Sequence, residues 1–180
     1  MNKEERIQKR LDYLKQNGSL KQLRNFLEKC VKDYPDEYFF LSELTPVYNN
    51  LDMPDKALEV SKKAYLMAPD DVWVKRKYCL ALIGKEYSKE AIPLLDEILE
   101  RPLEQIAYDE HGEGMRYAKS IKNDSRFLKG LALEQLGEFT KAKQCLEEHL
   151  ANRRQGIYSD YTKAQVQKHI KSCEAGLERP

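Results

Sequence analysis

The side chains most able to do chemistry in this sequence are few and lie apart. The three histidines, His111, His149 and His169, fall in three separate stretches. His111 stands in the segment DEHGEG with Glu110 and Glu113, where an imidazole and carboxylates would suit a metal ion. One histidine with carboxylates at this spacing is more typical of a solvated acidic loop. We therefore predict no metal site.

Nucleophilic catalysis is not indicated either. The sequence contains no GxSxG, no glycine-rich phosphate loop and no HExxH. The four cysteines lie far apart without a CxxC pair, at Cys30, Cys79, Cys145 and Cys173. This spacing predicts reduced thiols that fill helical cores, and not zinc ligands or a disulfide framework. We predict a protein that is not an enzyme, with no catalytic residue and no cofactor.

The charge balance argues against two further classes of partner. Among 180 residues there are 31 Lys and Arg and 30 Asp and Glu, which gives a formal net charge of +1. Proteins that bind nucleic acid or a membrane surface generally are strongly basic, so we predict neither partner. The beginning, MNKEERIQKR, lacks the apolar core of a secretory signal, and no run approaches the roughly 18 apolar residues of a membrane span. We expect a cytoplasmic protein.

The residues that best reveal the architecture are KGLALEQLGEFTKA, from Lys129 to Ala142. Small and apolar residues at helical spacing precede Leu136-Gly137, and glycine ends a helix readily because it adopts the left-handed conformation. A second helix then begins at Phe139. Small residues such as Gly130 let two helices approach closely. The stretch therefore predicts a helix, a tight turn and the start of a second helix.

The same pattern recurs along the chain. Ala57 and Ala91 are 34 residues apart, and Leu23 stands 34 residues before Ala57. Ala142 follows Ala91 after 51 residues, which is one period plus 17. Proline disfavours helix in the residue before it, and prolines mark the ends of the periods at Pro35, Pro69 and Pro102.

These features resemble the tetratricopeptide repeat (TPR), a helix-turn-helix unit of about 34 residues. The resemblance implies an all-α, TPR-like α-solenoid of stacked antiparallel helix pairs in a single domain over 1–180. The repeats are expected at about 4–37, 38–71, 72–103 and 123–152, with a capping helix at about 160–177. The sequence departs from the family pattern at Pro46, inside a predicted helix, and at Lys75, where a large apolar residue is usual.

Residues 104–122 interrupt the period. From Asp96 to Glu113 there are seven acidic residues and one basic residue, Arg101. We interpret the interruption as an acidic loop, flexible around Gly112 and Gly114, followed by a helix that continues into the first helix of the fourth repeat. Long loops inside compact domains are more often functional than short ones.

The resemblance also implies a concave groove lined by the first helix of each repeat. Transferred to this chain, the groove positions include three aromatic residues on one wall, Phe39, Trp73 and Phe127. Arg76 lies beside Trp73, and aromatic and arginine side chains dominate binding hot spots. The remaining predicted groove residues are Asn49, Asn50 and Gln135. The alternative is structural: the asparagines only shape a turn, and the aromatic residues pack on neighbouring helices or on the final helix.

We therefore predict a non-enzymatic interaction scaffold or adaptor that binds a protein or peptide in this groove. The first alternative is a dedicated neutralising (immunity-like) or chaperone partner of one effector, in which the acidic segment masks a basic surface. The second is a metal-dependent enzyme centred on Glu110, His111 and Glu113. A weak homo-oligomer is a further association to consider. Binding of RNA ranks last and would use the basic residues Lys3, Arg6, Lys9, Arg10, Arg153 and Arg154.

Overall fold

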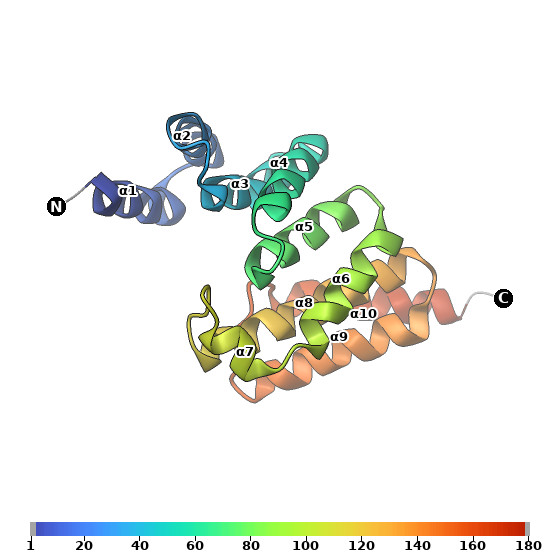
Figure 1. Ribbon diagram of the computed structural model, residues 1–180. Coiled ribbons are helices and arrows are strands. Elements are labelled where there is room, and N and C mark those ends of the chain that lie inside the picture. The colour runs from blue at the N-terminus through green and yellow to red at the C-terminus, as the bar shows by residue number, and fades with distance from the viewer. Residues whose placement is uncertain (1–2, 179–180) are drawn as a thin grey trace. The chain divides into compact units, whose positions relative to one another are not determined.

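The computed structural model describes residues 3–178, apart from the side chain of Glu4, and this part of the chain holds ten α-helices and no strand (Figure 1). The prediction of an all-α fold is confirmed. The helices cluster in two compact units, Met1–Ala68 and Pro69–Pro180, which we describe one at a time. The expectation of one domain over 1–180 stays a prediction, and residues 1, 2, 179 and 180 lie outside the described residues.

The first unit contains four helices: α1 (Lys3–Asn17), α2 (Leu20–Asp33), α3 (Tyr38–Asn50) and α4 (Pro54–Met67). Each helix packs on the next one along the chain. The core residues of α1 and α2 recur at helical spacing and are Leu11, Leu14, Leu23, Leu27 and Cys30. Ser19 caps α2, because its hydroxyl accepts from the Gln22 N–H while the Gln22 side chain accepts from the Ser19 N–H.

The second unit contains six helices: α5 (Val72–Gly84), α6 (Ser88–Glu100), α7 (Leu103–Tyr108), α8 (Met115–Gln135), α9 (Phe139–Arg154) and α10 (Lys163–Leu177). The 21-residue helix α8 organises this unit, since it contacts all five of the others. Thr162 and Gln165 form a capping box at the start of α10.

Three helix pairs are closed by the same turn. A residue with positive φ follows the first helix at Asp52 (55°), Glu86 (62°) and Gly137 (76°). The next residue donates its N–H to the carbonyl five positions earlier: Met53 to Tyr48, Tyr87 to Leu82 and Glu138 to Leu133, each at 2.9 Å. This is the Schellman pattern, in which the last orphan carbonyls of a helix receive donors. The turns at Asp52 and Glu86 are 34 residues apart, which is the sequence period, and the turn at Gly137 follows after 51 residues.

The close approach predicted at Gly130 is present between α8 and α9. A Cβ at Gly130 would lie 2.8 Å from Leu146 Cγ. A second close approach involves α10, where a Cβ on Gly176 would lie 2.6 Å from the ring of Phe139. Both glycines therefore allow a neighbouring helix to lie nearer than any larger residue would permit.

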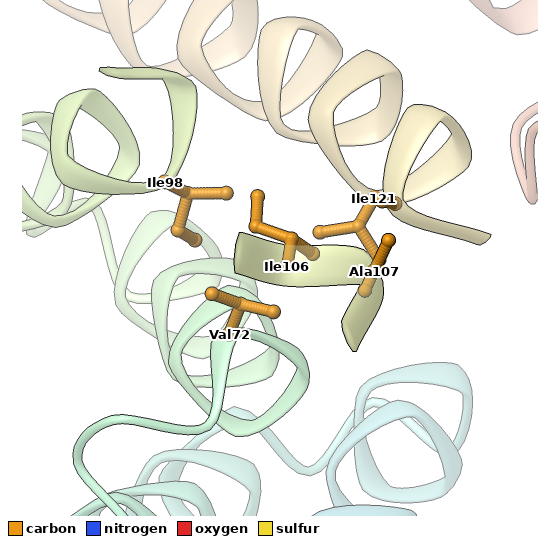
Figure 2. Close-up of a cluster of buried hydrophobic side chains, with 6 residues drawn as sticks. Val72, Ile98, Ile106, Ala107 and Ile121 are labelled. Carbon is orange, nitrogen blue, oxygen red and sulfur yellow. The ribbon is translucent and has the colours of Figure 1, made fainter. Parts of the chain in front are cut away.

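The insertion is more ordered than the sequence suggests. Its first part is helix α7, which places Ile106 and Ala107 in a buried cluster with Val72, Ile98, Ala118 and Ile121. Figure 2 shows Val72, Ile98 and Ile106 pointing toward one another between α5, α6 and α7. The sequence analysis emphasised the acidic residues and did not predict this helix. Its apolar residues nevertheless have helical spacing, at Leu103, Ile106 and Ala107.

The structure gives the loop around Gly112 and Gly114 a defined turn, and the flexibility of this loop stays a prediction. Gly114 donates its N–H to Ala107 O at 2.9 Å and has a φ of 91°. A Cβ on Gly112 would lie 2.4 Å from the same carbonyl oxygen. The two glycines therefore allow the loop after α7 to pack closely against the end of that helix. The part of the prediction that α8 continues into the fourth repeat is confirmed, because α8 runs unbroken from Met115 to Gln135.

If the insertion is part of the core, then Ile106→Ala will destabilise the second unit. Ile106 is 1% exposed, so we expect the free energy of unfolding to fall by about 2–4 kcal/mol, as for other large-to-small core substitutions. Urea denaturation followed by circular dichroism measures this. The control is Tyr108→Ala in the same helix, where the side chain is 71% exposed and little should change. Equal, small effects of both substitutions would contradict the assignment of Ile106 to the core.

Candidate functional site

The second unit contains a pocket of about 400 Å³ bounded by α5, α8 and the segment before α10. Helices α5 and α8 are each the first helix of a repeat pair, so the pocket lies where the sequence placed the groove. It is lined by Trp73, Arg76, Glu113, Arg116, Tyr117, Ser120, Ile121, Asp124, Tyr158 and Asp160. Trp73 and Arg76, predicted from the sequence, are thus together in one hollow.

The aromatic part of the pocket is formed by Trp73 and Tyr117, whose ring centroids are 5.6 Å apart. Two cations flank the indole: the guanidinium carbon of Arg76 lies 4.6 Å and the ammonium of Lys77 lies 4.4 Å from its centroid. Such cation–π contacts fix the ring in place. Burial raises the pKa of Tyr117, so its hydroxyl keeps its proton at neutral pH and is able to donate.

The polar part of the pocket is a buried ion-pair network. Arg76 is 5% exposed and Asp124 is 1% exposed. Nη1 of Arg76 donates to Oδ2 of Asp124 and Nη2 donates to Oδ2 of Asp160, both at 3.0 Å. The Asp160 N–H also donates to Asp124 Oδ2, at 3.1 Å. One guanidinium therefore joins α5 to α8 and to the chain segment before α10.

The network leaves two buried atoms without partners among the described residues, Nε of Arg76 and Oδ1 of Asp124. Burial raises the pKa of Asp124, while the Arg76 guanidinium and the Asp160 N–H offset part of the rise. An unpaired oxygen on a buried carboxylate is costly, so its presence in a pocket wall calls for an explanation.

Phe127 does not line the pocket, and its place in the predicted groove wall is corrected. It is 3% exposed. The ring of Tyr161 lies 4.1 Å from its centroid, and His149 and His169 contact other parts of the ring. The chain segment before α10 and α10 itself therefore cover Phe127, which is the structural alternative that the sequence left open.

Gln135 lies at the end of α8 and is not in the pocket lining. Its side-chain oxygen accepts from the Ser88 hydroxyl, and its Nε2 donates to Ile83 O at 3.1 Å. The side chain thus ties α8 to α5 and α6. We assign it this packing role, and nothing in its surroundings links it to Trp73.

The other predicted groove residues belong to the first unit. Phe39 is half-buried and lines a separate hollow of about 310 Å³ with Ile7, Gln8, Tyr34, Glu37 and Phe40. Asn49 and Asn50 lie in the last turn of α3 and outside this lining. The carbonyl of Asn49 accepts from the Asp52 N–H at 3.1 Å, which is part of the repeated turn.

His149 anchors the segment that carries Tyr161 and Asp160. The ring is fully buried. Nδ1 lies 2.8 Å from Asn123 O, and because a carbonyl only accepts, this nitrogen carries the proton. Nε2 lies 3.3 Å from Ser159 Oγ and accepts from it. Burial lowers the pKa of His149, so the imidazole is neutral at neutral pH.

The remaining histidines do not form a metal centre. His169 Nδ1 lies 2.7 Å from Glu134 Oε2, a contact that holds α10 on α8. His111 is exposed in the loop after α7. Within residues 3–178, no group of three or more His, Cys, Asp or Glu side chains is arranged to hold a metal ion.

The sequence did not identify several of the pocket residues. Asp124 sits in a run of three polar residues, Asn123 to Ser125, all of them buried in the structure. A polar run on the core face of a predicted helix was the available signal. Its partner Arg76 is 48 positions away, and no local pattern connects the two. Tyr158 and Asp160 lie between helices, where periodicity carries no information.

Comparison with known proteins agrees with the architecture. The family model described as the tetratricopeptide repeat matches residues 124–151. A solved structure of MamA from AMB-1 superimposes with a TM-score of 0.60 at 20% identity, covering 96% of this chain and 87% of that one. A MamA structure from Desulfovibrio magneticus RS-1 gives 0.61 at 14% identity, covering 99% and 91%. These likenesses show the fold, and the predicted resemblance is confirmed.

Two further comparisons bear on function. No curated protein matches the sequence significantly. Among the described helices, none is long and apolar enough to cross a bilayer. The expectation of a cytoplasmic location stays a prediction.

The buried ion pair yields a testable prediction. Arg76→Met leaves the Asp124 carboxylate buried without its cation, so we expect the free energy of unfolding at pH 7 to fall by about 3–5 kcal/mol. The double variant Arg76→Met with Asp124→Leu should recover most of this loss, since two apolar residues replace the pair. Urea denaturation of the three proteins measures the coupling. A double variant no more stable than Arg76→Met would contradict it.

His149 predicts a pH dependence of stability. Its pKa is lower in the folded chain than the ordinary value of about 6.5, so below that pH the unfolded chain takes up a proton that the folded chain does not. Stability should therefore fall as the pH drops from about 6.5, by up to about 1.4 kcal/mol per pH unit from this group. His149→Gln, measured by urea denaturation from pH 8 to pH 5, should show a shallower fall. Identical slopes would contradict the assignment.

Proposed function

We propose that this chain, whose fold is that of stacked tetratricopeptide-repeat helix pairs, acts without catalysis, as a scaffold or adaptor that binds a segment of another protein. Stacked helix pairs present a continuous face of first helices, and such faces commonly serve as binding surfaces. The fold alone does not identify a partner, because the same fold serves many functions. The proposal therefore depends on the pocket of the second unit.

The observation that carries the proposal is the half-buried Trp73 in a pocket on the first-helix face. Tryptophan, tyrosine and arginine are the residue types that contribute most to binding, and Trp73, Tyr117 and Arg76 all line this pocket. The ring of Trp73 is already held by Arg76, Lys77 and Tyr117. A ligand would therefore lose little free energy in ordering these side chains.

We extend the proposal to the first unit as a second contact surface. The hollow at Phe39 offers a half-buried aromatic ring to an apolar side chain. Asn49 is half-buried and Asn50 is exposed. An amide can both donate to and accept from a peptide backbone.

A narrower candidate is favoured by Glu113. This residue belongs to the acidic insertion and lines the pocket beside the aromatic pair. The pocket lining holds three carboxylates, those of Glu113, Asp124 and Asp160, and two arginines. This excess of acid suits a partner with a basic surface, as expected for a dedicated neutralising or chaperone partner of one effector protein. Co-purification from the native host distinguishes a dedicated partner from an adaptor. A dedicated partner should co-purify with one protein in stoichiometric amount, and an adaptor should co-purify with several.

The proposed function is tested with the protein that co-purifies. Trp73→Ala should weaken its binding by about 30-fold, the equivalent of about 2 kcal/mol for a hot-spot residue. Ser120→Arg should weaken it as well, because the longer side chain fills the pocket without removing packing. Isothermal titration calorimetry measures the affinities.

The matched control is Tyr87→Ala, which removes an exposed aromatic residue of the same unit outside the pocket lining. Its affinity should equal that of the unaltered protein. Circular dichroism confirms that each variant is folded. A partner that binds equally well to Trp73→Ala and to Ser120→Arg would refute the assignment of the pocket.

A further inference from the structure

We propose that the pocket between α5 and α8 receives a basic side chain, lysine or arginine, of the partner protein. The inference rests on the proposed function and adds to it the chemistry of the residue that is bound. It draws on the charge of the ion-pair network, on an unpartnered oxygen of Asp124, and on the aromatic side chains around them.

The ion-pair network carries an excess of negative charge. Arg76 is the one cation in it, and the carboxylates of Asp124 and Asp160 both bind to that guanidinium. Asp160 uses only Oδ2 for Arg76, and its side chain is 46% exposed. A second cation would therefore meet one uncompensated carboxylate charge at the wall of the pocket. Because water is partly excluded there, the attraction is stronger than at an open surface.

The two buried atoms without hydrogen-bond partners also favour a basic ligand. Nε–H of an arginine lies on the same edge of the guanidinium as Nη2, which here faces Asp160. A small rotation of Asp160 would bring its second oxygen to this donor. Oδ1 of Asp124 accepts no hydrogen bond from the described residues, and Asp124 is 1% exposed and lines the pocket. An ammonium or guanidinium carries the N–H donors that this oxygen lacks.

The aromatic side chains provide the rest of the site. Tyr117 and Tyr158 line the pocket, and Tyr158 is largely exposed. Aromatic faces attract cations and also cover the apolar stem of a lysine or arginine. Trp73 shows that this surface accepts cations, because the chain's own Arg76 and Lys77 already lie against its ring.

One lining residue has the opposite charge. Arg116 is exposed, three residues after the equally exposed Glu113. Both are in contact with solvent, where water and salt screen their charges. The buried carboxylate of Asp124 is screened far less, so the inner wall, and not the rim, decides the sign of the preferred ligand.

The experiment uses the fluorescence of Trp73, the only tryptophan of the chain, in the full-length protein. Four blocked amino acids are titrated: the N-acetyl methylamides of lysine, arginine, norleucine and glutamate. Norleucine matches the lysine stem without its charge. We expect the lysine and arginine derivatives to bind at least about 5-fold more tightly than norleucine, as cation–π and charged hydrogen-bond contacts would give. The glutamate derivative should bind more weakly than norleucine.

Two charge variants locate the effect. Asp160→Asn should remove most of the preference for lysine over norleucine. Glu110→Gln removes one negative charge from the nearby loop outside the pocket lining and should leave the preference unchanged. Equal loss in both variants would mean that the general acidity of the region attracts the probe, and would overturn the inference.

Norleucine or glutamate binding as tightly as the basic derivatives would also overturn it, as would no response to either basic derivative at millimolar concentration. These results would not contradict the proposed function. The proposed function depends on whether Trp73→Ala and Ser120→Arg weaken binding of the co-purified partner. A partner insensitive to both substitutions would remove the proposed function instead.

Discussion

The constraint on which three of the repeats depend is the turn that closes their helix pairs. A residue in the left-handed conformation, at Asp52, Glu86 or Gly137, lets the next N–H return to the helix that has just ended. Five residues after each of these positions stands a fully buried alanine: Ala57, Ala91 and Ala142. The turn therefore sets the point at which the second helix crosses the first, and only a small residue fits there. Only one of the three turns uses glycine. Asp52 and Glu86 adopt the left-handed conformation as well, which costs a residue other than glycine about 1–2 kcal/mol.

The same turns limit how the inserted residues are accommodated. Between Glu86 and Gly137 there are 17 residues more than one period, yet the turns at both ends are the same. The added length is accommodated by α7 and by additional turns at the start of α8, which pack on each other. Those additional turns carry Tyr117 and Ser120, which form one wall of the pocket. The departure from the period is thus what gives the second unit a pocket beside Trp73.

The sequence was sufficient for the elements that repeat, because each depends on contacts within about 34 residues. The buried alanines, the turn at Gly137 and the close approach at Gly130 all follow from local spacing. The structure of the acidic insertion was harder to predict. Its packing depends on two apolar residues, Ile106 and Ala107, which stand among charged residues in the sequence. The pocket was only half predictable. Trp73 and Arg76 follow from repeat positions, whereas Asp124 and Asp160 depend on contacts 48 and 84 residues distant.

The segment before α10 determines part of the lining of the pocket in the second unit. Four hydrogen bonds hold it on the second unit: Asp160 bonds to Arg76 and to Asp124, Ser159 bonds to His149, and the carbonyl of Tyr161 bonds to Arg153. A buried ion pair of this kind is generally no more stabilising than apolar residues of the same size, so stability alone does not account for it. Its consequence here is geometric, because the same segment lays Tyr161 over Phe127 and places Asp160 and Tyr158 at the pocket. The network thus helps to form a pocket of about 400 Å³, and under the proposed function this size suits one or two anchoring side chains of a partner.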